Sequence, residues 1–419
     1  MRVSAAFSRL LRLSGVWVKQ VRFAPERVIV EVALRRRRLR CPRCEFSTRH
    51  RHDVRPVASV WRHLDLGVWR LELRARLRRL DCPTHGVRVE GVPFARPDCR
   101  FTRDFEQLVA WLATRADKTT ITRLARIDWD TVGRIITRVS DDELDPDRLQ
   151  DLFEIGIDEV SWRRQHRYLT LVSDHQRRCV VWGAEGNGQA AADAFFAELG
   201  PERSQRIEAI SMDMGPGYAK SARKPEHAPR ATLCIDNFHV AALATKALDE
   251  VRRDYWNELR SLGDQQAAKR FKDARWALLK NPEHLTDTQA ATHRALRLAG
   301  GEVWRAYTLK EATRAIFAAG LTSDDVGHLL GRLISRCARS RLRPFVHLGQ
   351  TLRKHRQGIL AARRLGLSNA RSEALNNKVR LITRRAYGFH TAQAALALVM
   401  LTCGPITLRP PHELHPLTP

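Results

Sequence analysis

The sequence predicts a multidomain α/β protein, and three observations lead to this fold class. Cysteine and histidine residues at metal-ligand spacing interrupt segments of strand period in residues 1–100. Residues 151–239 contain apolar segments of strand period, first in direct succession and then alternating with helical segments. Residues 240–365 follow a helical pattern rich in alanine, leucine and arginine. We therefore expect a small metal-binding head, short helices, a mixed sheet and an all-α insertion.

The charge of the chain indicates nucleic acid as its partner. The net charge is +27 over 419 residues, and basic clusters recur along the whole length rather than in one tail. Arginine predominates among the basic residues, and its planar guanidinium matches phosphate oxygens. A polyanion long enough to contact all of these clusters is most simply nucleic acid, so we expect double-stranded DNA as the partner.

The cysteine content and the hydropathy bound the cellular setting. Eight cysteines, of which only two form a close pair, are too few for a disulfide scaffold. No segment approaches the roughly 18–20 apolar residues of a membrane span. The basic N-terminus lacks a continuous apolar segment, so we expect no signal peptide. These features predict a cytoplasmic protein with reduced thiols and no membrane partner.

Two short motifs of equal spacing predict one zinc site in residues 1–100. Cys41 and Cys44 form a Cys-x-x-Cys pair, and Cys82 and His85 repeat the spacing in a later motif. Zinc prefers four sulfur and nitrogen ligands in a tetrahedron, so these residues predict a structural Zn²⁺ ribbon. The alternative is a free thiol pair beside a surface histidine. Rival ligands are Cys99, His50 and His52.

Residues 101–140 change to helical period and predict a helix-turn-helix domain. Two short amphipathic helices are joined by a tight turn, as in DNA-binding proteins that place the second helix in the major groove. The second helix would expose Thr131, Arg134 and Arg138 toward DNA. The alternative is a structural helical linker to the next domain.

The order of strands in residues 151–239 predicts a ribonuclease H-like catalytic core. Three strands follow one another directly, and two more alternate with helices. This order places the ends of the first and fourth strands side by side, so Asp158 and Asp213 would face each other. The predicted strands cover residues 152–158, 167–173, 178–183, 206–212 and 231–235, with a helix over 189–199.

The all-α insertion over 240–365 separates this sheet from the rest of the core, 366–400. The insertion contains Trp256, Trp276 and Trp304, which we expect in its core rather than on a base-stacking surface. Residues 401–419 are proline-rich, and we expect them to form a loose tail.

The first helix after the insertion has one apolar and one polar face. A helix packed across the sheet beside the first strand would bring its polar face to Asp158. This face would supply a third carboxylate together with DNA-binding side chains. The apolar stripe consists of Leu375, Val379, Ile382 and Ala386, and the polar face of Glu373, Asn377, Arg380 and Arg384.

Three carboxylates at one end of a sheet predict metal-dependent phosphoryl transfer. Asp158, Asp213 and Glu373 cannot all stay ionised there without cations. Oxygen ligands favour Mg²⁺ or Mn²⁺, and two such ions roughly 3.5–4 Å apart are usual in phosphoryl transfer. Substitute members of the site are Glu159, Asp174 and Asp236, the last with His239 near the same edge.

Nine stretches follow one another along the chain: CPRC, WRHLDL, CPTHGV, FTRDFE, IGIDEVSW, RYLTLVSD, ISMDMGPGYAKS, CIDNFHV and SNARSEALNNKVRLITRRAYGF. This order resembles the bacterial insertion-sequence transposases of the ISL-three family. The resemblance implies a DDE triad of Asp158, Asp213 and Glu373. One departure is Asn237, where the family usually has a basic residue.

The resemblance also implies an activity and its setting. Such a transposase binds the terminal inverted repeats of an insertion sequence and catalyses metal-dependent DNA strand cleavage and strand transfer. We expect a homodimer or higher homo-oligomer on DNA, in the bacterial cytoplasm and associated with the nucleoid when bound.

Two other classes of protein remain alternatives. A zinc and helix-turn-helix repressor would explain the charge but gives the three carboxylates no task. A structure-selective nuclease of the ribonuclease H-like fold would explain the carboxylates but needs no sequence-reading head. Metal-dependent nicking followed by joining to a second DNA separates all three classes.

Overall fold

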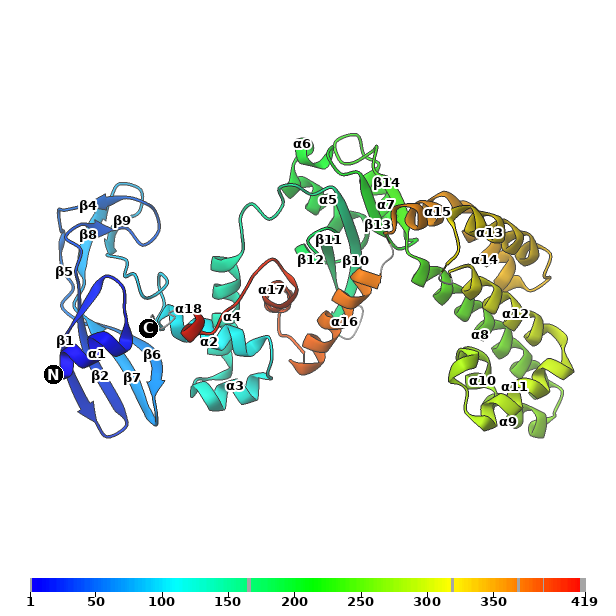
Figure 1. Ribbon diagram of the computed structural model, residues 1–419, viewed down its shortest axis with the longest axis horizontal. Coiled ribbons are helices and arrows are strands. Elements are labelled where there is room, and N and C mark those ends of the chain that lie inside the picture. Colours follow the sequence, from blue (N-terminus) through cyan, green and yellow to red (C-terminus); the bar gives the residue numbers. More distant parts are fainter. Residues whose placement is uncertain (1, 164–166, 318–319, 368–369, 387, 415–419) are drawn as a thin grey trace. The chain divides into compact units, whose positions relative to one another are not determined.

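The computed structural model describes residues 2–163, 167–317, 320–367, 370–386 and 388–414, without the side chains of residues 370–373 and 376. The chain forms two compact units (Figure 1). The first unit contains Met1–Asp145 and Ile382–Pro419, and the second contains Pro146–Leu381. The second boundary falls inside α16 (Ala370–Arg385), so this helix contributes residues to both units.

The first unit begins with helix α1 and a four-stranded sheet of order β1-β2-β7-β6. Alternate apolar residues bury one face of each central strand, as in Val28 and Val30 of β2 and Leu71 and Leu73 of β7. Phe7 of α1 joins this core. The elements are α1 (Val3–Leu11), β1 (Val16–Ala24), β2 (Arg27–Leu34), β6 (Ser59–Leu66) and β7 (Trp69–Ala75).

A smaller head of short strands extends from this sheet. Its core is small and consists of Leu39, Leu80 and two buried cysteines, Cys41 and Cys82. A core of this size gives little hydrophobic stabilisation and calls for a further cross-link. The strands are β3 (Leu39–Arg40) paired with β4 (Ser47–Thr48), and β5 (Asp53–Val54), β8 (Arg78–Cys82) and β9 (Gly86–Val89) in the order β5-β8-β9.

Three helices follow, and each begins where a side chain caps it. The side chains of Thr102, Asp117 and Asp128 accept hydrogen bonds from the backbone N–H three residues further on. Each cap satisfies a donor that would otherwise lack a partner at the helix start. The helices are α2 (Arg103–Ala113), α3 (Lys118–Ala125) and α4 (Trp129–Glu143).

The C-terminal segment packs with these helices. Helix α17 (Ala392–Cys403) is apolar on nearly all sides and lies against α4. Helix α18 (Pro411–Leu414) lies against α2, and Pro410 and Pro411 are buried. The prediction assigned residues 366–400 to the catalytic core and 401–419 to a loose tail. The described residues 382–414 instead pack with the first unit, apart from residue 387, and residues 415–419 lie outside the described part of the chain. The physical reason is that α17 must bury more than one face, and α4 covers part of it.

The second unit is built on a five-stranded sheet of order β12-β11-β10-β13-β14. The first three strands are antiparallel, whereas β13 and β14 run parallel to β10. The predicted succession of strands and helices is thus present. The elements are β10 (Glu154–Arg163), β11 (Arg167–Asp174), β12 (Cys179–Glu185), α5 (Gly188–Leu199), α6 (Pro201–Ser204), β13 (Ala209–Met212), α7 (Pro216–Ala222) and β14 (Thr232–Ile235).

Helices alone follow β14 in the described part of the chain. Of the tryptophans expected in the helical core, Trp256 and Trp304 pack against it, but Trp276 is half exposed. No described helix is long and apolar enough to cross a membrane. The helices are α8 (Asn237–Ser261), α9 (Gln265–Asp273), α10 (Arg275–Leu279), η1 (Pro282–His284), α11 (Asp287–Ala299), α12 (Gly301–Ile316), α13 (Ser323–Ala338), α14 (Arg343–Lys354) and α15 (Arg356–Leu365).

Candidate active site

Asp158 and Asp213 lie side by side toward the same end of two neighbouring strands, β10 and β13, of the five-stranded sheet. Strands β10 and β13 run parallel, with Gly156 paired to Ser211. Two residues further along each strand the chain reaches Asp158 and Asp213, and neighbouring strands are about 4.8 Å apart. Both side chains are half-buried and line the same pocket of about 690 Å³. The structure therefore brings the first two predicted carboxylates together.

Backbone N–H groups orient both carboxylates. The N–H of Glu159 donates to Asp158 Oδ1 at 2.7 Å, and that of Gly215 donates to Asp213 Oδ1 at 2.9 Å. A Cβ on Gly215 would lie only 2.9 Å from Asp213 Oδ1. Glycine at this position therefore lets the carboxylate fold back onto its own turn, which fixes its direction.

Glu159 adds a further carboxylate to the pocket. Burial raises the pKa of Glu159, and the nearby charges of Asp213 and Asp158 raise it further, against the neutral donors Asn187 and Tyr218. The Tyr218 hydroxyl donates to Glu159 Oε2 at 3.4 Å. Among the described residues, no ion pair involves Glu159 or Asp213. This edge of the sheet therefore carries excess negative charge that calls for a cation.

The other substitute carboxylates have structural partners. Asp236 follows β14, is almost fully buried, and caps α8 by accepting a hydrogen bond from the N–H of Phe238 at 3.0 Å. It also lines the pocket. Asp174 pairs with Ile155 at the far end of β10, forms an ion pair with Arg177, and does not line the pocket. The geometry thus removes Asp174 from the candidate site.

Basic side chains line the same pocket from two helices. Lys246 of α8 and Arg380 of α16 are exposed, and His239 of α8 lies beside them. Arg380 donates to Asn377 Oδ1 at 3.3 Å, so this polar face of α16 reaches the pocket. The predicted third carboxylate, Glu373, lies two turns earlier in α16, and its side chain is outside the described part of the structure. Arg384 is exposed and belongs to the first unit.

The four predicted zinc ligands converge in the N-terminal head. One ligand atom from each of Cys41, Cys44, Cys82 and His85 lies within 4.8 Å of the others. Cys44 Sγ and Cys82 Sγ are 3.6 Å apart, and His85 Nδ1 lies 3.8 Å from Cys41 Sγ. Two sulfurs bound to one tetrahedral zinc ion, each about 2.3 Å from the metal, would lie about 3.8 Å apart. The donor set therefore fits zinc.

One thiol of this cluster, that of Cys82, ionises more readily than an ordinary cysteine. Burial opposes ionisation of Cys82, but hydrogen bonds with His85 and the neighbouring backbone outweigh it and lower the pKa of the thiol to about 6. A thiolate is the form that binds a metal. By contrast, burial and a hydrogen bond to Glu106 raise the pKa of Cys99 to about 12. The rival ligands Cys99, His50 and His52 do not belong to the cluster of described ligand atoms.

Comparison with known proteins assigns the chain to a family. A family model for the ISL3 DDE domain, described as "Transposase", matches residues 155–398. The "Helix-turn-helix domain of transposase family ISL3" matches residues 90–140, and the "zinc-finger of transposase IS204/IS1001/IS1096/IS1165" matches residues 37–85. The chain belongs to the ISL-three family of transposases.

Two relatives show how much of this transposase the likeness covers. It is 40% identical over 397 residues to "Transposase for insertion sequence element IS1557" of Mycobacterium tuberculosis, which covers 90% of this chain and 88% of the relative. It is 29% identical over 354 residues to "Transposase for insertion sequence element IS1001" of Bordetella parapertussis, which covers 83% and 85%.

The DNA-binding helices of the transposase use two of the three predicted contact residues internally. Thr131 is buried and donates its hydroxyl to Oδ2 of the cap residue Asp128 at 2.7 Å, so it is not exposed as the sequence predicted. Arg138 pairs with Glu106 Oε1 at 2.6 Å. Arg134 has a mostly exposed side chain that makes a 2.8 Å hydrogen bond to Thr131. Of the two arginines, Arg134 is the more exposed, with 67% of its side-chain surface accessible against 30% for Arg138.

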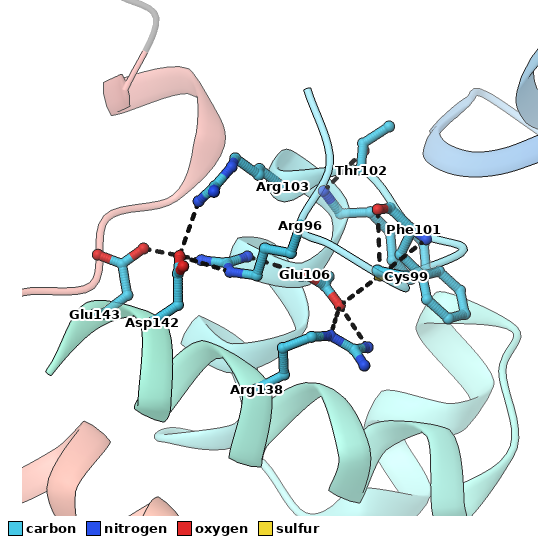
Figure 2. A network of polar contacts seen from close by, with 10 residues as sticks. Arg96, Cys99, Phe101, Thr102, Arg103, Glu106, Arg138, Asp142 and Glu143 are labelled. Atoms are coloured by element: carbon cyan, nitrogen blue, oxygen red, sulfur yellow. Dashed lines mark hydrogen bonds and ion pairs between the residues drawn. The ribbon is translucent and has the colours of Figure 1, made fainter. Parts of the chain in front are cut away.

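Arg138 belongs to a buried ion network that joins α2 and α4 to the segment before them (Figure 2). Glu106 is fully buried and forms ion pairs with Arg96, at 3.0 Å, and with Arg138. It also accepts a hydrogen bond from the Cys99 thiol at 3.0 Å. Arg96 also contacts Asp142 at 2.8 Å and Glu143 at 2.9 Å. This network fixes the loop that leaves the zinc head against the helix-turn-helix.

Some pocket residues were not anticipated from the sequence. Lys246 was missed although His239, Ala242, Leu243 and Lys246 follow helical spacing along α8 and all line the pocket. That periodicity, counted from His239, would have found it. Tyr218 does not line the pocket but donates to Glu159, and no local pattern marks a tyrosine that does so from a separate helix.

Proposed function

We propose that this transposase cuts and joins DNA strands at the terminal inverted repeats of its insertion sequence, with Asp158, Asp213 and Glu373 as a DDE triad. The observation that carries the proposal is the parallel register of β10 and β13, which sets the two aspartates level in one pocket. The strand order supports assignment of this unit, with its helical insertion, to the ribonuclease H-like fold.

The donor set of the pocket fits hard divalent cations. Its acidic atoms are all oxygens, which suit Mg²⁺ or Mn²⁺ better than zinc. Asp158, Asp213 and Glu373 would hold the ions, with Glu159 beside them. When bound, such ions activate an attacking oxygen and take charge from the leaving oxygen. The raised pKa of Glu159 and the backbone-oriented carboxylates support a site prepared for added positive charge.

The residues of the chain itself bind and position the DNA strand. Lys246 and Arg380 line the wall of the pocket, and their positive charges would attract a negatively charged phosphodiester. Asn377 holds the Arg380 guanidinium through its amide oxygen. These side chains would place the scissile phosphate near the carboxylates, which on their own would repel it.

Recognition of the element ends falls to the first unit. We propose that the helix-turn-helix docks on DNA with α4 near the major groove and that Arg134 contacts a base edge or a phosphate. Arg138 braces α4 through Glu106 instead. The zinc ion would be structural, because four protein ligands leave no position open for substrate.

The test uses the full chain, a labelled duplex that ends in the terminal repeat, and Mg²⁺ or Mn²⁺. Each of the three amide variants, Asp158→Asn, Asp213→Asn and Glu373→Gln, should lower nicking and joining by a factor on the order of a thousand, which is about 4 kcal/mol. End binding should remain nearly intact, because phosphate and base contacts come from elsewhere.

Asp174→Asn is the matched control, since Asp174 of β11 lies opposite Ile155, away from the pocket. If the unmodified chain nicked the duplex but formed no joined products, it would act as a nuclease and not as a transposase. Three amide variants that still cut would refute the proposed triad.

A further inference from the structure

Beyond the first turn of α13, which holds Asp324 and Asp325, three helices of the insertion carry positive charge without an acidic residue. From Val326 to Ser372 the sequence contains no aspartate or glutamate, although α13, α14 and α15 are rich in arginine. Arg332 and Arg336 of α13 and Arg339 at its C-cap recur at helical spacing, and all three are exposed. Like charges at this spacing repel one another, so the arrangement needs an external anion to become favourable.

Some cations in the earlier helices of the insertion are paired with carboxylates. Arg252 pairs with Asp249 at 2.8 Å, and Arg314 pairs with Glu283 at 2.9 Å. By contrast, among the described residues no carboxylate lies within ion-pair distance of any arginine or lysine on α13, α14 or α15. We refer to α13, α14 and α15 together as the basic layer. The positive charge of this layer is therefore available to a ligand.

Close backbone contacts make the layer rigid. A Cβ on Gly349 of α14 would lie 2.9 Å from Cys337 Cβ of α13, so the two helices approach through glycine. A Cβ on Gly358 of α15 would lie 2.7 Å from Ile235 Cγ1 at the end of β14. Only glycine permits such approach without displacement. The layer is thus fixed to the sheet strand that leads to Asp236.

The layer also begins beside the catalytic pocket. Gly358 packs on Ile235, and the next residue, Asp236, lines the pocket. Burial lowers the pKa of His355, and Lys354 lowers it further, whereas the charge of Asp213 acts in the opposite direction. His355 is therefore within electrostatic reach of Asp213, and the exposed Lys354 and Arg356 flank it.

We propose that α13, α14 and α15 form a phosphate-binding surface for double-stranded DNA, which continues from the active-site pocket and holds the duplex without reading its sequence. The proposal rests on the proposed function in that the DNA held there is the DNA that reacts in the pocket. Arginine side chains on a rigid layer suit phosphate oxygens, and a surface without base-reading contacts would serve DNA of any sequence.

The test compares two variants of the full chain with the same change in charge. The test variant is Arg332→Gln/Arg336→Gln/Arg339→Gln. The control is Arg294→Gln/Arg297→Gln/Arg305→Gln, which removes three exposed arginines from α11 and α12 of the same insertion. Fluorescence anisotropy measures binding to two duplexes of equal length, one with a terminal repeat and one of random sequence, over a series of salt concentrations and without divalent metal.

The test variant should bind both duplexes roughly tenfold more weakly at low salt, and its log–log salt slope should fall by about 2–3, since each phosphate contact contributes about 0.9. The control should stay within about twofold of the unmodified chain at both duplexes. Equal behaviour of the two variants would overturn the proposal. Loss on the terminal repeat alone would overturn the claim of sequence-independent contact.

A second variant, Lys354→Gln/Arg356→Gln, carries the test if the first fails to fold by thermal melting, and it should weaken both duplexes in the same way. Because these measurements contain no divalent metal, they do not depend on cleavage. Failure of the amide variants to stop cleavage would refute the DDE triad while leaving this binding result intact.

Discussion

Two regions of the molecule remove carboxylates from water and treat their charge in opposite ways. In the first unit, Glu106 is fully buried between Arg96 and Arg138. In the second unit, Glu159 and Asp213 share a pocket without an ion pair among the described residues, and the pKa of Glu159 is raised. A carboxylate that holds two parts of a fold together is neutralised by arginine. We propose that the carboxylates without an ion pair among the described residues serve metal ions instead.

The largest expected effect concerns the zinc site of the N-terminal head, where a zinc ion would balance the negative charge of the thiolates. Removal of zinc by a chelator, or Cys82→Ser, should unfold the zinc head of the transposase, because zinc binding supplies apparent free energies of about 10 kcal/mol or more in small zinc domains. Zinc content and circular dichroism of the full chain measure this. An unchanged melting curve in chelator would show that the head does not need the metal.

The buried network provides the next largest effect. Glu106→Gln keeps the shape of the side chain but leaves Arg96 and Arg138 without their shared counter-charge, so it should destabilise the first unit by about 3–5 kcal/mol. Glu143→Gln, at the partly exposed end of the same network, should cost less than about 1 kcal/mol. Denaturant titration compares them. Equal midpoints for the two variants would mean that burial of the ion pair is unimportant.

Arg134 and Arg138 test whether an arginine that neutralises a carboxylate can also serve DNA. Arg134→Gln should weaken binding to the terminal repeat by about 1–3 kcal/mol with little change on random DNA if it reads a base. Arg138→Gln should lower stability, and its loss of DNA affinity should follow the loss of folded protein. Competition binding at a temperature where both variants are folded separates the two roles. Equal loss on both duplexes would make Arg134 a phosphate contact.

The smallest effect is a pH dependence at the pocket. A folded pKa of Glu159 above its ordinary value of 4.5 means that the protonated acid stabilises the fold. This stabilisation is complete below pH 4.5 and is lost as the pH rises through the folded pKa. In metal-free protein, the Tm of Glu159→Gln should therefore rise relative to that of the unmodified chain between pH 4.5 and pH 7. A constant difference in Tm between the two proteins over this range would mean that the fold does not raise the pKa of Glu159.

The sequence was most informative where chemistry restricts both residue type and spacing. The four zinc ligands follow from two motifs of equal spacing, and the positions of Asp158 and Asp213 follow from strand order. Between Asp325 and Glu413, moreover, the only acidic residue is Glu373. This isolation is a sequence signal for a retained carboxylate that periodicity alone does not provide.

The sequence was least informative about partners that meet only in the fold. The polar spacing of α4 predicted that Thr131 and Arg138 face DNA. This spacing cannot reveal that Arg138 forms an ion pair with Glu106 of α2. The apolar character of α17 likewise does not show that α4 is the surface that it covers. Both errors concern tertiary contacts that override a local helical pattern.

The central claim is that the carboxylates at the end of β10 and β13 hold the divalent ions. The most direct measurement is Mn²⁺ binding, followed by electron paramagnetic resonance, in zinc-loaded full-length protein without DNA. Asp213→Asn should weaken Mn²⁺ binding by at least about tenfold, whereas Asp174→Asn, on β11 and outside the pocket, should leave it unchanged. Equal Mn²⁺ affinity in Asp213→Asn and the unmodified chain would contradict the account.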